Sequence, residues 1–467
     1  MGSIEVGVGE GHEEEPVSPT GQYFNSSVLS IGVICAFETE IALDDSPALD
    51  LLRDVFLPIN PRFSSIMVTD ENGVKKWERV TMNLEEHVYK PIFAEGLSLE
   101  TYDLYLQNYL SNMAMEKFPQ SKPLWELHIF KYPTSNSAGT IIFKLHHALG
   151  DGFSLMSALF SCLQRADDPS LTITFPSIKF QDDDQSNIFK ILPNIVSKIV
   201  NTTSDFVWSL LKSSVLADDQ TPIRSGTEGV ELLPITISSV TFSLDLIRQI
   251  KTKIGGSVND VLVGTIFYGT RLYMQNAKKD SSNAHSTALV LLNTRAIKTY
   301  KKVDEMVKPD AESPWGNQFG FLHIAVPKFD DVESADPLAF VYNAKETIKR
   351  KRDSLAVFLT GSLMEIMRKF RGHESTAQYI RGTLRNASMT VSNMIGPSEK
   401  IAIANHPCKG MYFMVIGVPQ SLTITIVSYM GNVRVAFGAE KGFINHKLLA
   451  SCLDKAFERI FKAAINS

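Results

Sequence analysis

The chain has little cysteine and no clustering of cysteine with histidine. Its 467 residues include 4 cysteines, at positions 35, 162, 408 and 452, and none of them forms a Cys-x-x-Cys pair. A disulfide framework or a zinc site normally requires cysteines at close, repeated spacing. We therefore expect reduced thiols in a cytosolic environment and no metal.

The chain also lacks an excess of positive charge and a long uncharged apolar run. Its 46 Lys and Arg residues against 51 Asp and Glu residues leave a net charge of -5. This balance offers no general basic surface for a nucleic acid, so we expect no nucleic-acid partner. The most apolar helical pattern, residues 187–216, is interrupted by Lys190, Lys198, Asp205 and Lys212. We therefore predict no membrane span there, but either a crossover helix between domains or an amphipathic helix at a bilayer surface.

Residues 1–20 have no apolar core of the kind found in secretory signals. They are rich in Gly and Glu, and we expect a disordered acidic tail. The length of the chain predicts two domains, because single cores rarely grow so large. We place an N-terminal α/β unit at 21–185, a helical linker at 186–231 and a second α/β unit at 232–467.

Chemically reactive side chains are concentrated near residue 150. An apolar strand pattern from position 141 leads into His146 and His147, followed by Asp151 between Gly150 and Gly152. A helical pattern begins at once after the second glycine. The sequence thus predicts a strand–turn–helix with ionisable groups at the turn.

A neutral imidazole can accept a proton from a hydroxyl near pH 7. Alternation along the strand would place His147 on the face of Phe143 and Leu145, as for a base that faces an apolar substrate. We therefore take His147, His146, Asp151 and Gly152 as the candidate catalytic residues. A carboxylate four residues beyond the histidine would hold the loop or orient the imidazole.

These residues resemble the HHxxxDG motif of the CoA-dependent acyltransferase superfamily. Segments elsewhere narrow the resemblance to the plant-type wax ester synthase/diacylglycerol acyltransferase family, because they match its motifs in order. The matching segments are Pro123-Leu124-Trp125 (PLW), Asn259-Asp260 (ND) and Ser392-Asn393-x-x-Gly396-Pro397 (SNxxGP). The implied fold is α/β, with two chloramphenicol-acetyltransferase-like subdomains of mixed sheets flanked by helices and a tunnel between them.

The resemblance implies transfer of a long-chain acyl group from acyl-CoA to a long-chain fatty alcohol, and also to diacylglycerol. His147 would act as general base without an acyl-enzyme. Acyl-CoA would be a substrate, so no cofactor is expected. Hydrophobic substrates and the family together imply peripheral membrane contact at the cytosolic face of the endoplasmic reticulum, with the plasma membrane or cytosol as alternatives.

The resemblance also assigns supporting roles. Asn259, Asp260, Ser392 and Asn393 would lie at the substrate site, with Asn393 or a backbone N–H stabilising the oxyanion. Asn259 or Asp260 as an ordinary helix N-cap is the alternative. Arg295 would form an ion pair with Asp151 and support the catalytic loop. Trp125 is expected to be architectural.

The glycine-flanked segment Gly316-Asn-Gln-Phe-Gly320 fits neither a P-loop nor a dinucleotide fingerprint. We predict a plain turn before a strand at 321–326.

Related functions stay open. The chain has no DFGWG-like segment, which the related plant BAHD acyltransferases carry, and no carrier or adenylation region of a condensation enzyme accompanies it. An acyltransferase with a small alcohol or amine acceptor remains possible, as does a non-catalytic lipid-binding protein. The intact histidines and aspartate argue against the second.

Overall fold

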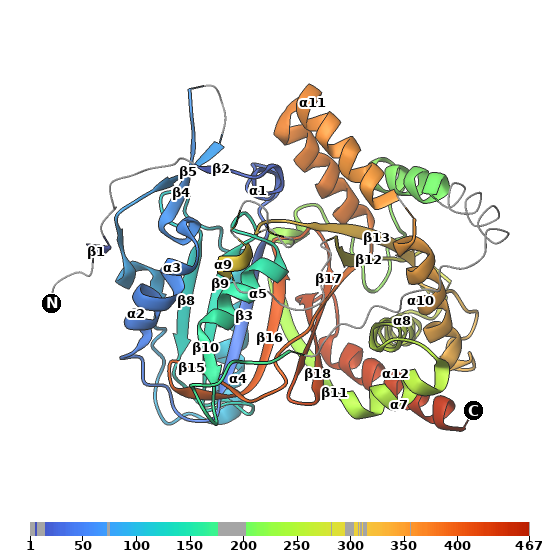
Figure 1. Ribbon diagram of the computed structural model, residues 1–467. Coiled ribbons are helices and arrows are strands. Elements are labelled where there is room, and N and C mark those ends of the chain that lie inside the picture. The colour runs from blue at the N-terminus through green and yellow to red at the C-terminus, as the bar shows by residue number, and fades with distance from the viewer. Residues whose placement is uncertain are drawn as a thin grey trace, which may run out of the picture.

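The structure is a computed structural model that describes residues 5–6, 15–71, 75–175, 202–281, 283–294, 303–306, 308, 311, 315–354 and 356–466. Two large sheets stand side by side, each with helices packed on it (Figure 1). The described chain therefore has the two-part α/β architecture that the sequence predicts.

The first sheet has seven strands and holds the histidine motif. Its central strand, β3, pairs antiparallel with the histidine strand β9 on one side and with β16 on the other. Helix α4 packs on one face and α5 on the other, so both faces are buried. In spatial order the strands are β10 (Leu163–Arg165), β15 (Ile401–Ile403), β16 (His406–Ile416), β3 (Gly32–Thr39), β9 (Gly139–His146), β8 (Trp125–Phe130) and β7 (Val88–Tyr89).

Short elements complete this half of the molecule. Two small sheets pair β1 (Glu5–Val6) with β6 (Met82–Asn83), and β2 (Glu15–Pro16) with β5 (Lys75–Arg79) and β4 (Ser65–Thr69). The helices are α1 (Pro19–Phe24), α2 (Ala48–Leu51), a π-helical turn at Leu52–Phe56, α3 (Leu57–Ile59), α4 (Leu99–Met115) and α5 (Gly152–Ser161), with 3-10 turns at Pro61–Ser64 and Leu84–His87.

The second sheet has six strands, and β14 pairs in parallel with both β12 and β17 while the other pairs are antiparallel. In spatial order these are β11 (Ile235–Ser243), β18 (Asn432–Glu440), β17 (Leu422–Tyr429), β14 (Met389–Met394), β12 (Thr287–Asn293) and β13 (Phe319–Ala325). The helices of this half are α7 (Leu244–Ile254), α8 (Val258–Ala277), α9 (Val303–Met306), α10 (Pro337–Arg352), α11 (Ala356–Asn386) and α12 (His446–Asn466), with 3-10 turns at Val230–Leu232 and Lys279–Ser281.

Helix α8 is the centre of the second core. It lies between α10 and α12, and nearly all of its side chains from position 260 to position 274 are buried. Its start is determined locally: Ser257 is the N-cap, and the Asp260 carboxylate accepts a hydrogen bond from the Ser257 N–H, which completes a capping box. The preceding helix α7 ends at Gly255, whose φ of 58° is left-handed, as a glycine stop signal predicts.

Residues 401–416 depart from the predicted division of the chain. We assigned them to the second unit, but β15 and β16 belong to the first sheet, where β16 runs beside β3 (Figure 1). The chain then returns to the second sheet through β17, and the Thr425 hydroxyl hydrogen-bonds the Phe413 carbonyl. This crossing links the two halves covalently and by hydrogen bonding.

The expected disorder of residues 1–20 is wrong for the part that the structure describes from Glu15 onward. Strand β2 pairs with β5, Val17 is buried, and helix α1 begins at Pro19 under a Ser18 cap. The apolar Val17 and the Ser-Pro start of a helix were overlooked among the acidic residues.

Several elements were predicted and one long helix was not. The hairpin of β4 and β5 is confirmed, although its Asn72-Gly73 turn lies outside the described residues. In the predicted helix at 187–216, residues 202–214 are helical and those before 202 are not described. The sequence did not predict helix α11. This helix bends at Gly372, where φ is 80°, and the bend interrupts the regular spacing of apolar residues by which a long helix is recognised. Among the described residues, none of the helices combines the length and apolarity that crossing a bilayer requires.

Candidate active site

The histidine motif forms a buried turn between strand β9 and helix α5. The strand ends at His146, so His147 is the first residue of the turn, and its N–H donates to the Ile31 carbonyl. The alternation of side chains along the strand therefore does not determine the direction of the His147 side chain, because His147 lies beyond the strand. Asp151 caps α5, because its Oδ1 atom accepts a hydrogen bond of 3.0 Å from the Ser154 N–H.

His146 holds the turn together. Its Nδ1 atom accepts a hydrogen bond of 3.0 Å from the Ala148 N–H, so its Nε2 carries the proton and donates to the Ser30 hydroxyl at 3.2 Å. The ring is fully buried, and burial lowers the pKa of His146 to about 3. A neutral ring with both nitrogens engaged is a structural element of the loop.

His147 is the reactive candidate of the pair. Its side chain is 6% exposed, and burial lowers its pKa to about 4 while the nearby Asp151 charge opposes the shift. The rings of Phe24 and Phe319 lie 5.6 and 6.4 Å from its ring, centroid to centroid. His147 is thus a neutral imidazole at physiological pH within an aromatic enclosure, which is the state that a general base requires.

The segment at residues 315–318, where the sequence predicts a plain turn, is hydrogen-bonded to this loop and holds it in place. The Trp315 indole N–H donates to the Leu149 carbonyl at 2.8 Å, and the Ser154 hydroxyl donates to the Gly316 carbonyl at 3.0 Å. The Asn317 amide donates to the His147 carbonyl at 3.0 Å. These contacts join positions more than 160 residues apart.

The same segment reaches the motif aspartate. Its Oδ2 atom accepts a hydrogen bond of 2.8 Å from the Gln318 backbone N–H, while Oδ1 caps α5. Both carboxylate oxygens of Asp151 therefore support the loop. The Asp151–Arg295 ion pair stays a prediction, because Arg295 lies outside the described residues.

The ND and SN motifs meet where the start of α8 lies beside the end of β14, both in the second half of the molecule. The Asn393 amide donates to the Asn259 Oδ1 atom at 3.1 Å, and Ser392 is buried within β14. The Asp260 carboxylate is engaged in the capping box, whereas the N-cap itself is Ser257 and not the predicted Asn259 or Asp260.

Glycines allow β14 to approach the histidine motif. A Cβ atom on Gly152 would lie 3.3 Å from the Met394 sulfur, so the start of α5 lies against the end of β14. The structure thus brings the SNxxGP segment next to the histidine motif.

Trp125 lies in the core of the first subdomain. It is fully buried, its indole N–H donates to the Phe63 carbonyl at 2.7 Å, and it stacks on His87. With its polar atom satisfied inside the core, Trp125 packs the sheet and does not face a substrate.

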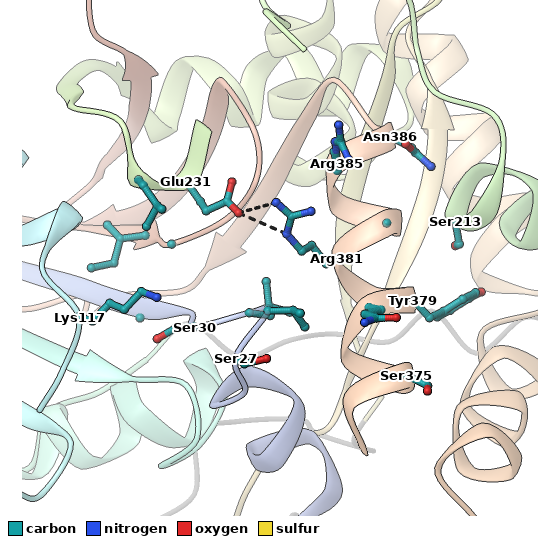
Figure 2. A pocket seen from close by; sticks show the side chains of 18 of the residues that line it. Ser27, Ser30, Lys117, Ser213, Glu231, Ser375, Tyr379, Arg381, Arg385 and Asn386 are labelled. Carbon is teal, nitrogen blue, oxygen red and sulfur yellow. Dashed lines mark hydrogen bonds and ion pairs between the residues drawn. The ribbon is translucent and has the colours of Figure 1, made fainter. Parts of the chain in front are cut away.

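A large cavity lies where the two subdomains meet. It has a volume of about 800 Å³ and is lined by residues 27–30 on one side and by helix α11 on the other. Figure 2 shows Arg381 paired with Glu231 on its wall, at a shortest distance of 2.7 Å, and Lys117 across from them. Ser30, which binds His146, also lines this cavity and connects it to the motif.

A second chamber of about 310 Å³ adjoins the first, because Ser213 and Tyr379 line both. Phe24 and Phe319, the rings that flank His147, form part of its wall, as does Gln318. The two cavities occupy the region where we expected a tunnel.

The described residues contain no group of three or more His, Cys, Asp or Glu side chains placed to hold a metal ion. The four cysteines are buried and unpaired.

The chain is similar to known proteins over nearly its whole length. The chain matches the family model "Wax ester synthase/diacylglycerol acyltransferase catalytic domain" over residues 74–262 and "WS/DGAT C-terminal domain" over residues 315–461. It is 30% identical to wax ester synthase/diacylglycerol acyltransferase 11 of Arabidopsis thaliana over 485 aligned positions, which cover 100% of this chain and 98% of that protein.

Solved structures show the same fold at low sequence identity. The wax ester synthase/diacylglycerol acyltransferase from Marinobacter aquaeolei VT8 aligns with a TM-score of 0.59 at 15% identity, covering 96% of this chain and 99% of that one. The starter condensation domain of a rhizomide synthetase aligns with a TM-score of 0.52 at 11% identity, covering 97% and 94%. The predicted fold class is confirmed.

Proposed function

Because the chain belongs to the wax ester synthase/diacylglycerol acyltransferase family, we propose that it transfers a long-chain acyl group from acyl-CoA to a fatty alcohol, and also to diacylglycerol. The observation that carries the proposal is the neutral, enclosed His147 beside an aromatic-walled chamber. A lipid acceptor has the chemistry to occupy such a chamber, and its hydroxyl is the group that a neutral imidazole deprotonates.

The proposed reaction needs one base and no covalent enzyme intermediate. His147 accepts the alcohol proton as the alcohol oxygen attacks the thioester carbonyl carbon, and a tetrahedral oxyanion forms. The carbon–sulfur bond then breaks, and the imidazolium returns the proton to the departing CoA thiolate. Asn393 is our candidate for stabilising the oxyanion, since its amide keeps a second N–H after donating to Asn259.

We assign the larger cavity to the CoA portion and the smaller chamber to a lipid chain. Cationic side chains line the larger cavity. Arg381 forms ion pairs with Glu231 and Glu228, whereas Lys117 has no ion pair with an acidic residue among those described, so its charge is available to a phosphate of CoA. The smaller chamber has an apolar part, formed by Phe321, Met364 and Ile380 together with the rings of Phe24 and Phe319, and its other walls carry serine, threonine and histidine side chains. In this arrangement the thioester of acyl-CoA reaches the histidine motif from the larger cavity, and the hydroxyl of the acceptor reaches it from the smaller chamber.

Membrane association at the cytosolic face of the endoplasmic reticulum is part of the proposal, with the plasma membrane and cytosol as alternatives. Helix 202–214 exposes Trp208 and Leu211, and α11 exposes Ile366 and Phe370, the last at 77%. Helix 202–214 also contacts the C-terminal half of α11 through Ser213 and Thr383. Co-sedimentation with anionic vesicles would test it, with a Phe370→Ser variant expected to bind more weakly.

The activity assay measures thiol release from palmitoyl-CoA by lipid-supplemented protein, with hexadecanol, diacylglycerol or no acceptor. We expect acceptor-dependent release, formation of the ester, and loss of both in a folded His147→Ala variant. Absence of release with either lipid acceptor, from protein shown to be folded, would contradict the proposed function.

A further inference from the structure

We infer that Asn317 is a positioning residue for the base: its side-chain oxygen receives the Nδ1 proton of His147, which leaves Nε2 as the nitrogen that takes the alcohol proton. This inference rests on the proposed function for its catalytic meaning, but its structural part stands independently. Two polar atoms, one on each of these side chains, are buried and lack a well-formed hydrogen bond.

The two atoms are complementary and belong to residues already in contact. His147 Nδ1 and Asn317 Oδ1 are both buried, and neither has a hydrogen-bond partner of good geometry among the described residues. The same Asn317 side chain donates through Nδ2 to the His147 carbonyl at 3.0 Å. His147 Nδ1 is a ring nitrogen that can carry a proton and donate a hydrogen bond, and Asn317 Oδ1 is an amide oxygen that can only accept a hydrogen bond.

Leaving both atoms unpaired would cost free energy, because a buried polar group without a partner loses its hydration and gains nothing in return. Because Asn317 already contacts His147 through its Nδ2 atom, the acceptor within its reach for the Nδ1 proton is Oδ1 of the same amide. Hydrogen bonds at active sites are often long before substrate binds and tighten in the reacting complex. The pair is therefore poised to form one bond that satisfies both groups.

The groups around the His147 ring also favour a proton on a nitrogen that faces an acceptor. The Asn317 side chain and the Gly150 backbone both raise the pKa of His147, against the larger effect of burial, so both act as acceptors toward a ring N–H. The reverse orientation of the amide would set its oxygen against the His147 carbonyl oxygen, which is repulsive. The amide orientation that donates to that carbonyl is the one that offers Oδ1 to the ring.

Asn317 itself is held in place from two directions. The preceding Trp315 and Gly316 are tied to Leu149 and Ser154, and the following Gln318 N–H is tied to Asp151. The side chain of Asn317 thus belongs to a segment that is hydrogen-bonded to the catalytic loop on both sides of it. A residue so anchored can select the imidazole tautomer and its rotation, as the partner of a catalytic histidine commonly does.

The first test compares steady-state kinetics of Asn317→Ala and Asn317→Asp with the unmodified protein, using palmitoyl-CoA and hexadecanol. We expect Asn317→Ala to lower kcat by about 10- to 100-fold with little change in KM, because the base is misoriented while the substrates still bind. Asn317→Asp restores an acceptor with a negative charge, so it should recover part of kcat and move the acidic limb of the pH profile upward.

Asn83→Ala is the matched control, because it removes an asparagine cap remote from the site, whose Oδ1 accepts from the Glu85 N–H at 3.1 Å. It should lower stability without changing kcat or the pH profile. If Asn317→Ala behaves like this control, and Asn317→Asp leaves the acidic limb in place, the assignment is overturned.

The second test does not depend on activity. In protein labelled with ¹⁵N-histidine, the His147 signals, identified by their loss in His147→Ala, should report an Nδ1–H tautomer. In Asn317→Leu they should shift toward the Nε2–H tautomer. Nε2–H in the unmodified protein would refute the inference even if the protein is an active acyltransferase, whereas Nδ1–H in a protein without acyltransferase activity would support it while contradicting the proposed function.

Discussion

The Asp151 carboxylate joins the histidine loop to the residue that precedes strand β13, because its Oδ2 atom accepts a 2.8 Å hydrogen bond from the Gln318 N–H. Its other oxygen caps helix α5. The aspartate of the motif is thus a structural bridge between the two sheets as well as a negative charge near His147.

Replacing Asp151 should lower both stability and rate. Asp151→Ala removes a helix cap and a charge-assisted hydrogen bond, and we expect a loss of about 2–4 kcal/mol in the free energy of unfolding. kcat should also fall, because the loop loses its link to the residue that precedes β13. Urea denaturation and thiol release measure the two effects. A variant that retains full stability would show that the carboxylate does not bridge the sheets.

The buried motif histidines make stability depend on pH. The pKa values of His146 and His147 are lowered to about 3 and about 4, whereas both residues titrate near 6.5 in the unfolded chain. Below pH 6.5 the unfolded state binds protons that the folded state does not, so stability decreases as pH falls toward 4. The contribution is about 1.4 kcal/mol per pH unit for each histidine.

Denaturant titrations at pH 7.5, 6 and 5 would measure this slope, with His146→Asn and His147→Asn variants for comparison. Each variant should flatten the decline between pH 6.5 and 5. An unchanged slope in both would contradict the prediction, because it would mean that the two histidines bind protons equally well in the folded and unfolded states.

The pH dependence of catalysis should differ from that of a free imidazole. A base with a pKa of about 4 is already neutral at pH 5, so kcat/KM should not fall on acidification through 6.5. Thiol release between pH 5 and 8, corrected for the folded fraction, checks this. An acidic limb near pH 6.5 would show that His147 becomes hydrated in the working enzyme.

Gly396 should tolerate no side chain. A Cβ atom there would lie 2.0 Å from the Ser428 carbonyl oxygen on the neighbouring strand, so Gly396→Ala must push β14 and β17 apart. We expect a loss of about 3 kcal/mol or more. Gly361→Ala in α11 is the control, because its added Cβ meets no atom within 4 Å and should be neutral or slightly stabilising. Equal thermal shifts for the two variants would contradict the prediction.

Asn259 and Asn393 should act as a pair. The hydrogen bond between their side chains joins the start of α8 to the end of β14, where the two motifs meet. A double-mutant cycle with Asn259→Ala and Asn393→Ala should give a coupling energy of about 0.5–1 kcal/mol in the free energy of unfolding. Fully additive effects would show that the bond does not form in solution.

The sequence by itself determined the features that depend on neighbouring residues. The histidine turn, the Gly255 stop of α7 and the strand–helix alternation follow from local glycine geometry and apolar periodicity. The resemblance between motifs added the fold class, because motif order survives where overall identity does not. The capping box at Ser257 was also within reach, since its two residues are three positions apart.

Only the tertiary structure decided which distant segments meet. Nothing in the local pattern of residues 315–318 distinguishes a clamp on the His147 loop from a plain turn, because its hydrogen-bond partners lie more than 160 residues earlier. The same holds for β16, an apolar strand that either sheet could accommodate and that pairs with β3. Pairing of this kind is selected by the packing of the whole core, which no short stretch of sequence contains.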